Sequence, residues 1–89
     1  MKEIQFNQYG NVFVADTECK NDFNLHIELS AYGTVTVYQK TAGEKFALLH
    51  RQTSNERVID VDFDGIIWPK QIKITSTCPT EKCLLTEKS

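Results

Sequence analysis

Hydrophobic and polar residues alternate along much of this chain, most clearly over residues 23–29. Four large apolar residues are separated there by three polar ones, in the order Phe23-Asn24-Leu25-His26-Ile27-Glu28-Leu29. Because successive side chains of a β-strand point to opposite faces of a sheet, this stretch has one apolar and one polar face. The pattern predicts a half-buried strand, whereas no segment shows the sustained apolar period of an amphipathic helix.

Turn residues separate further short segments of the same kind, which is typical of antiparallel sandwiches and barrels. We expect strands over Lys2–Asn7, Asn11–Asp16, Asn24–Ser30, Thr34–Lys40, Lys45–Gln52, Arg57–Phe63, Gln71–Thr77 and Cys83–Thr86. The polar stretch Thr17–Asp22 is expected to be a loop, and Asp64-Gly65 a tight turn. The sequence therefore predicts a single all-β domain over residues 1–89, an antiparallel β-sandwich of about seven to nine short strands, jelly-roll-like or immunoglobulin-like.

Two hairpins are expected from the register of the apolar residues. A loop over Ala31-Tyr32-Gly33 would place Leu29 opposite Val35, with Gly33 in the left-handed conformation that glycine adopts without strain. A second loop over Thr41–Glu44 would pair Val37 with Leu48 and Tyr38 with Ala47, and would place Tyr38 and Leu49 on the outer face. The run Phe46-Ala47-Leu48-Leu49 is apolar on both faces, so we expect its strand to be central or to meet a partner.

The length and the net charge of the chain exclude several classes of function. A chain of 89 residues forms one modest core without a deep cleft, so we expect no enzyme. The net charge is −2, and the longest basic cluster is the pair Lys70 and Lys73, so we expect no nucleic-acid partner. With neither an apolar signal region nor an apolar run of ~20 residues, we expect no secretion and no membrane span, but a place in a virion or the cytoplasm.

The candidate chemistry is sparse. The chain has three cysteines, Cys19, Cys78 and Cys83. An odd number favours free thiols over a disulfide framework. Residues 60–65, Asp60-Val61-Asp62-Phe63-Asp64-Gly65, match the first half of a calcium loop, in which alternate carboxylates converge on the cation. The second half fails, because its twelfth position is Gln71 rather than glutamate. We therefore expect the solvent face of a strand and no cofactor, with Asp60, Asp62 and Asp64 as a weak calcium candidate.

Aromatic residues with polar edges are the strongest candidates for binding, because each offers a flat apolar body and a polar tip. Tyr32 is expected at a hairpin tip, and Trp68 immediately before Pro69, which ends a short apolar run. Tyr38 and Leu49 are expected to form an exposed apolar cluster, which on a small domain indicates contact with another molecule. The predicted interface residues are Tyr32, Tyr38, Leu49 and Trp68.

Residues 62–74, Asp62-Phe63-Asp64-Gly65-Ile66-Ile67-Trp68-Pro69-Lys70-Gln71-Ile72-Lys73-Ile74, resemble a strand–turn–strand ending of small β-sandwich accessory proteins of tailed-phage virions. The opening segment Ile4–Val14, two short strands around a Tyr-Gly turn, is similar to those modules too. The resemblance implies a capsid- or tail-decorating role without catalysis, in which the chain binds other protein subunits. The alternative is a carbohydrate-binding β-sandwich module that uses the exposed aromatics Trp68 and Tyr32.

Overall fold

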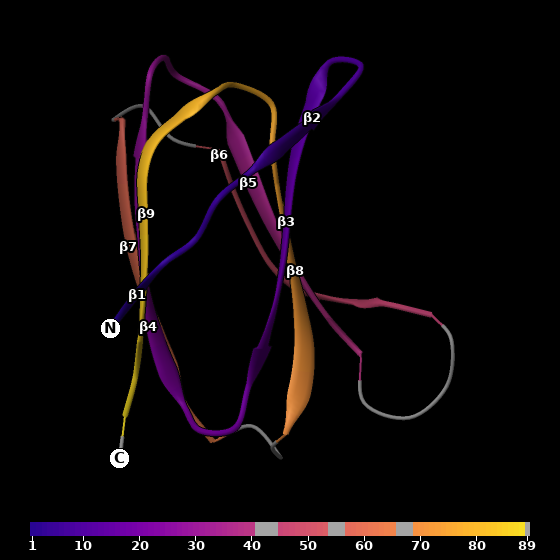
Figure 1. Cartoon of the computed structure of the whole chain (residues 1–89), viewed down its shortest axis with the longest axis vertical. Helices are drawn as coiled ribbons and strands as arrows, with labels where there is room; N and C mark the ends of the chain where they lie inside the picture. The colour runs from indigo at the N-terminus through magenta and orange to yellow at the C-terminus, as the bar shows by residue number, and fades with distance from the viewer. Residues whose placement is uncertain (41–44, 54–56, 66–68, 89) are drawn as a thin grey trace.

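The computed structural model describes residues 1–40, 45–53, 57–65 and 69–88. This part of the chain contains nine strands and no helix, arranged as two facing sheets (Figure 1). The strands are β1 (Lys2–Glu3), β2 (Asn7–Tyr9), β3 (Val12–Cys19), β4 (Phe23–Leu29), β5 (Thr34–Lys40), β6 (Ala47–Thr53), β7 (Val58–Phe63), β8 (Lys70–Ser76) and β9 (Thr80–Glu87). The predicted all-β sandwich is confirmed, and among the residues described no helix is long and apolar enough to cross a membrane.

The order of the strands identifies the kind of sandwich. One sheet has the order β1-β9-β4-β7 and the other the order β2-β3-β8-β5-β6, and every pair of neighbours is antiparallel. The pairs β5·β6, β4·β7, β3·β8 and β1·β9 are nested, as if one long hairpin had been wrapped so that successive pairs fall in alternate sheets. This nesting is the arrangement of a jelly roll, with β2 as an additional edge strand.

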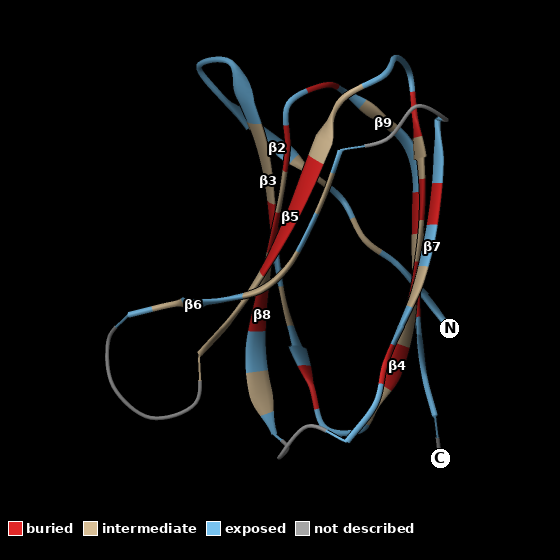
Figure 2. Ribbon diagram, turned by 180° about the vertical axis from the view of Figure 1, so that it is seen from behind, coloured by how far each residue is buried: buried red, intermediate tan, exposed pale blue. Residues whose placement is uncertain are grey.

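The core lies between the two sheets and follows the sequence alternation closely. In β4 the four apolar residues are buried and the three polar residues are only half-buried. Phe23 stacks on Phe63 of the neighbouring strand β7 with a distance of 4.8 Å between the ring centroids. Figure 2 shows buried segments on the strands of both sheets. The buried apolar residues that pack together are Cys19, Phe23, Leu25, Ile27, Leu29, Val35, Val37, Ile59, Phe63, Ile72, Ile74, Cys78, Cys83 and Leu85.

The predicted hairpin between residues 24–30 and 34–40 is wrong, because β4 and β5 belong to different sheets. The cross-strand neighbour of Leu29 is Thr80, and those of Val35 are Gln52 and Ser76. Gly33 does not have the positive φ that the hairpin required, which is found at Gly10 (61°) and at Gly65 (73°) of the predicted Asp-Gly turn. Two strands that face each other across a core show the same alternation as two that pair within a sheet, so the pattern alone did not separate the cases.

The predicted pairs of the second hairpin are wrong because the register next to its loop is shifted by one residue, with Tyr38 opposite Leu48 and Gln39 opposite Ala47, and β6 also contains a bulge. The register is Val37 with His50 but Tyr38 with Leu48, so Leu49 is an extra residue in β6. A one-residue shift of register moves side chains to the opposite face of a strand. Leu49 accordingly packs against the core, and Leu48 takes the outward position beside Tyr38.

Several element boundaries also differ from the expectation. The predicted loop over Thr17–Asp22 begins as strand, because β3 continues to the buried Cys19. The predicted first strand is divided into the short strands β1 and β2, and the last strand is longer than expected. In β3 the inward position of Thr17 is polar, which concealed the alternation that ends at Cys19.

Candidate binding surfaces

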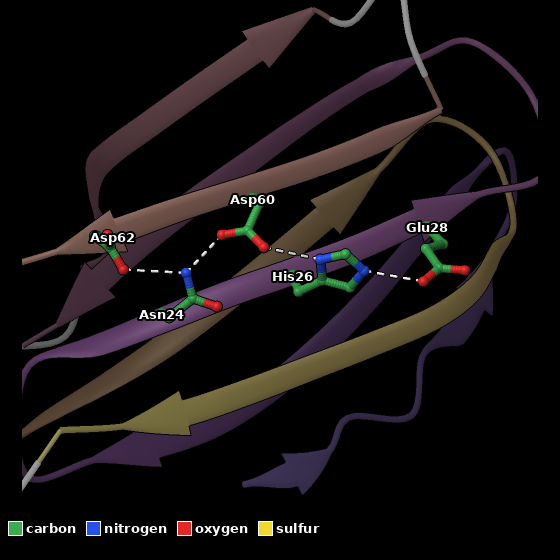
Figure 3. Close-up of polar contacts among 5 residues, drawn as sticks. All are labelled: Asn24, His26, Glu28, Asp60 and Asp62. Atoms are coloured by element: carbon green, nitrogen blue, oxygen red, sulfur yellow. Dashed lines mark hydrogen bonds and ion pairs between the residues drawn. The ribbon is translucent and has the colours of Figure 1, made fainter.

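The outer face of the four-stranded sheet carries a continuous row of polar side chains from β4 and β7 (Figure 3). The register places Asn24 opposite Asp62 and His26 opposite Asp60, so their outward side chains are neighbours. The Asn24 amide Nδ2 donates to Asp60 Oδ1 at 2.6 Å and to Asp62 Oδ1 at 3.0 Å. His26 Nδ1 lies 2.9 Å from Asp60 Oδ2, and His26 Nε2 lies 2.9 Å from Glu28 Oε2.

Both ring nitrogens of His26 therefore face a carboxylate oxygen. A neutral imidazole would direct one unprotonated nitrogen at an oxygen lone pair, whereas the imidazolium donates to both carboxylates. The hydrogen bonds to Glu28 and then to Asp60 raise the pKa of His26 above 6.5, the value of the free side chain. The amide of Asn24 and then His26 lower the pKa of Asp60. The row thus engages both ring nitrogens of His26 with carboxylates, and the raised pKa favours its protonated form.

The stability of the domain should consequently depend on the charge of His26. Because the folded-state pKa is above 6.5, the stabilisation is complete at pH values below 6.5 and is lost as the pH rises through the folded-state pKa. Chemical denaturation should show that His26→Gln is more destabilising at about pH 5.5 than at about pH 8.5. The ring protons of His26 should titrate in the NMR spectrum with a midpoint above 6.5. A midpoint at or below that value would contradict the ion pairing.

The three aspartates of the weak calcium candidate each have a side-chain partner in this structure. Asp60 and Asp62 lie on the outward face of β7 and share the Asn24 amide. Asp64 follows the end of β7 and accepts a hydrogen bond from Lys88 Nζ at 2.9 Å, while the same ammonium lies 3.6 Å from Asp62 Oδ1. Within the described ranges, no group of three or more histidine, cysteine, aspartate or glutamate residues could hold a metal ion.

The outer face of the five-stranded sheet has a different chemistry. Register places Lys73 beside Tyr38 and Tyr38 beside Leu48 across strands β8, β5 and β6. Phe46 lies on the same face, with Lys40 Nζ 5.0 Å and Lys73 Nζ 5.4 Å from its ring centroid. Leu48 is 56% exposed, which is high for a large apolar side chain on a strand. We call this surface the β5–β6 outer face, and its members are Tyr38, Lys40, Phe46, Leu48, Arg51 and Lys73.

The predicted interface residues do not form one cluster. Tyr38 lies on the β5–β6 outer face, but Leu49 packs against the core on the other side of the sheet. Tyr32 is 69% exposed and lies in the segment that joins the two sheets, rather than at a hairpin tip. Trp68 falls outside the residues that the structure describes. The sequence missed Leu48, although the two-sided apolar run in which it lies was the signal that pointed to this strand.

The cysteines and His50 are structural residues. All three cysteines are buried free thiols. Burial raises the pKa of Cys19 to about 11 and that of Cys83 to about 12, so neither is a thiolate nucleophile at neutral pH. His50 is half-buried, lies 3.1 Å from Gln52 through Nε2 and Oε1, and meets Phe63 edge-on, as expected for a hydrogen-bonded residue at the core boundary.

Three hollows in the described surface are small and shallow. Their volumes are about 220, 290 and 280 Å³, at or below the usual range for ligand pockets, and none of the three is lined by a histidine. The third lies between Glu18, Lys40 and Pro69, next to the β5–β6 outer face. The hollows therefore offer room for part of a ligand or a single protruding side chain.

In comparisons with known proteins, no family model, no curated protein and no solved structure matches this chain.

Proposed function

We propose that this domain is a non-enzymatic interaction module that binds another protein subunit through the β5–β6 outer face. The observation that carries the proposal is the exposed Leu48, which lies next to Tyr38 on a face that also carries the cations Lys40, Lys73 and Arg51. Protein interfaces commonly combine an apolar, aromatic centre with a polar rim. Full burial of a leucine side chain is worth about 1.5–3 kcal/mol, which makes Leu48 a candidate anchor.

We further propose that the bound subunit is part of a virion and that the domain is a capsid or tail accessory protein. Two considerations support this assignment. The sequence of residues 62–74 resembles phage accessory proteins, and jelly rolls recur in viral capsid domains. The fold supports this role by analogy, because one fold hosts many functions. The role is therefore tested directly on virus particles.

The test is sedimentation of the purified domain with and without assembled virions from the same biological source as the domain. Wild type should co-migrate with the particles at micromolar concentration, and Leu48→Glu should weaken this binding about a hundredfold, because a charge would replace the apolar anchor. The matched control is Tyr9→Glu, another exposed position that β3 and β8 separate from β5. The proposal fails if wild type does not co-migrate, or if the two variants bind equally well.

A second candidate is carbohydrate binding at the end of the sandwich where Tyr32 lies. Its supporting observations are the 69% exposure of Tyr32 and the occurrence of jelly rolls in lectin domains. An aromatic ring exposed in this way can stack on a sugar. A glycan array should then give binding that Tyr32→Ala removes. A silent array, together with Trp68 fluorescence that polysaccharide does not change, would dismiss this candidate.

A further inference from the structure

The two sheets have four edge strands, and three of them carry a feature that disfavours pairing with another chain. β1 has two residues and β2 has three, while β6 is interrupted by the bulge at Leu49. Short strands and bulges are common ways to block an edge. β7 has neither protection, because its six residues keep an unbroken register with β4. Within the described ranges, no strand pairs with its other side.

The backbone of β7 directs alternate hydrogen-bonding groups away from the sheet. The Leu29 N–H donates to the Arg57 carbonyl at 2.7 Å, which fixes the phase of the ladder between β4 and β7. In an antiparallel pair, residues that exchange hydrogen bonds alternate with residues that do not. Ile59, Val61 and Phe63 therefore bond to β4. The N–H and C=O groups of Val58, Asp60 and Asp62 point outward, where a further strand would lie.

The side chains along this edge determine which strand it would accept. On the outer face, the side chains of Asp60 and Asp62 are 56% and 57% exposed. The cations that face them are His26, which bonds Asp60, and Lys88, which lies beside Asp62 and Asp64. On the inner face, Val61 is only partly buried against the core. The edge is thus acidic on one face and apolar on the other.

We propose that β7 binds an extended segment of a partner protein as an added strand, with cationic residues at every second position and apolar residues between them. Directly opposed residues of adjacent strands have Cβ atoms about 5 Å apart, so the cations would lie beside Asp60 and Asp62 and the apolar residues would extend the cover of Val61. The β7 strand of a second copy is a poor fit, because full overlap of the two strands would place aspartates opposite aspartates. This site is on the other sheet from the β5–β6 outer face and goes beyond the function proposed above.

The experiment uses an alternating Lys-Val peptide of about eight residues, with an alternating Glu-Val peptide as its counterpart. Fluorescence anisotropy should show that only the Lys-Val peptide binds, and amide exchange should slow at Val58, Asp60 and Asp62. Asp62→Lys should weaken binding about tenfold, because an attractive cross-strand pair becomes repulsive. Asp16→Lys makes the same change of charge on the five-stranded sheet and should leave the affinity unchanged.

A Lys-Val peptide that is N-methylated at alternate residues separates strand addition from simple attraction of charge. Methylation removes the backbone donors that face β7 but keeps every lysine, so binding should be lost. Equal binding of the methylated peptide, or of the Glu-Val peptide, would overturn the proposal. So would an unchanged rate of amide exchange in β7, or self-association of the free domain that protects the same amides. None of these outcomes bears on Leu48, so the two proposals can fail separately.

Discussion

Ile27→Ala is expected to lower the free energy of unfolding by about 2–5 kcal/mol, which is the range for large-to-small substitutions in a packed core. Ile27 is fully buried in β4, which lies between β9 and β7 in the four-stranded sheet. Its cross-strand neighbours are Cys83 and Ile59, both buried. The truncation would leave a cavity in β4, a strand that is held by neighbours on both sides, so the surroundings have little freedom to close it.

The measurement is equilibrium denaturation in urea, with Leu48→Ala as the matched control. The control removes apolar atoms from a position on the outer surface and should cost under about 0.5 kcal/mol. The contrast tests burial, because both variants truncate large aliphatic side chains on strands. A loss below about 1 kcal/mol for Ile27→Ala would show that the assignment of the core is wrong.

Gly33→Ala should destabilise the domain by about 1–3 kcal/mol, the usual cost of overpacking. A Cβ atom at this position would lie 2.6 Å from Thr77 Oγ1 and 2.9 Å from Cys78 Sγ. Neither atom is free to move away. Thr77 Oγ1 accepts the Thr34 N–H at 2.9 Å, and Cys78 Sγ donates to the Ala31 carbonyl at 3.3 Å. The new methyl group must break one of these contacts or displace the segment that joins the two sheets.

A double-mutant cycle with Thr77→Ala provides the control. Thr77→Ala alone should cost about 1 kcal/mol through the loss of its hydrogen bond to Thr34, but it also removes the oxygen that the new Cβ would meet. The double variant should therefore be more stable than the sum of the two single effects. Strict additivity, or a neutral Gly33→Ala, would mean that the close approach at Gly33 does not constrain the fold.

Local alternation was sufficient to predict the faces of individual strands. The apolar residues of β4 and the residues Ile59, Val61 and Phe63 of β7 are inward as expected, and the bounds of β5 are those predicted from residues 34–40. A strand with period two and one buried face specifies its own orientation, because each apolar side chain must avoid water. The outward placement of Tyr38 follows from the same rule, and its register beside Lys73 agrees with it.

The alternation of apolar and polar residues did not predict which strands pair, or in which register. His26 and Asp60 are 34 positions apart in the chain, and only the register of β4 with β7 brings them together. Leu48 and Leu49 exchanged their predicted faces because Tyr38 pairs with Leu48 rather than with Ala47, a shift of one residue. Gly33 is required by the approach of Thr77 and Cys78 rather than by its own backbone angle.

The sequence by itself determined that this chain is a sandwich of short strands, and it determined which face of most strands is buried. Only the tertiary structure decided that the strands nest as a jelly roll, that Leu48 rather than Leu49 is exposed, and that β7 is an edge strand with an unbroken register. The physical reason is that alternation is set by each residue's own exchange between water and core, whereas sheet membership, register and bulges depend on contacts between segments distant in the chain.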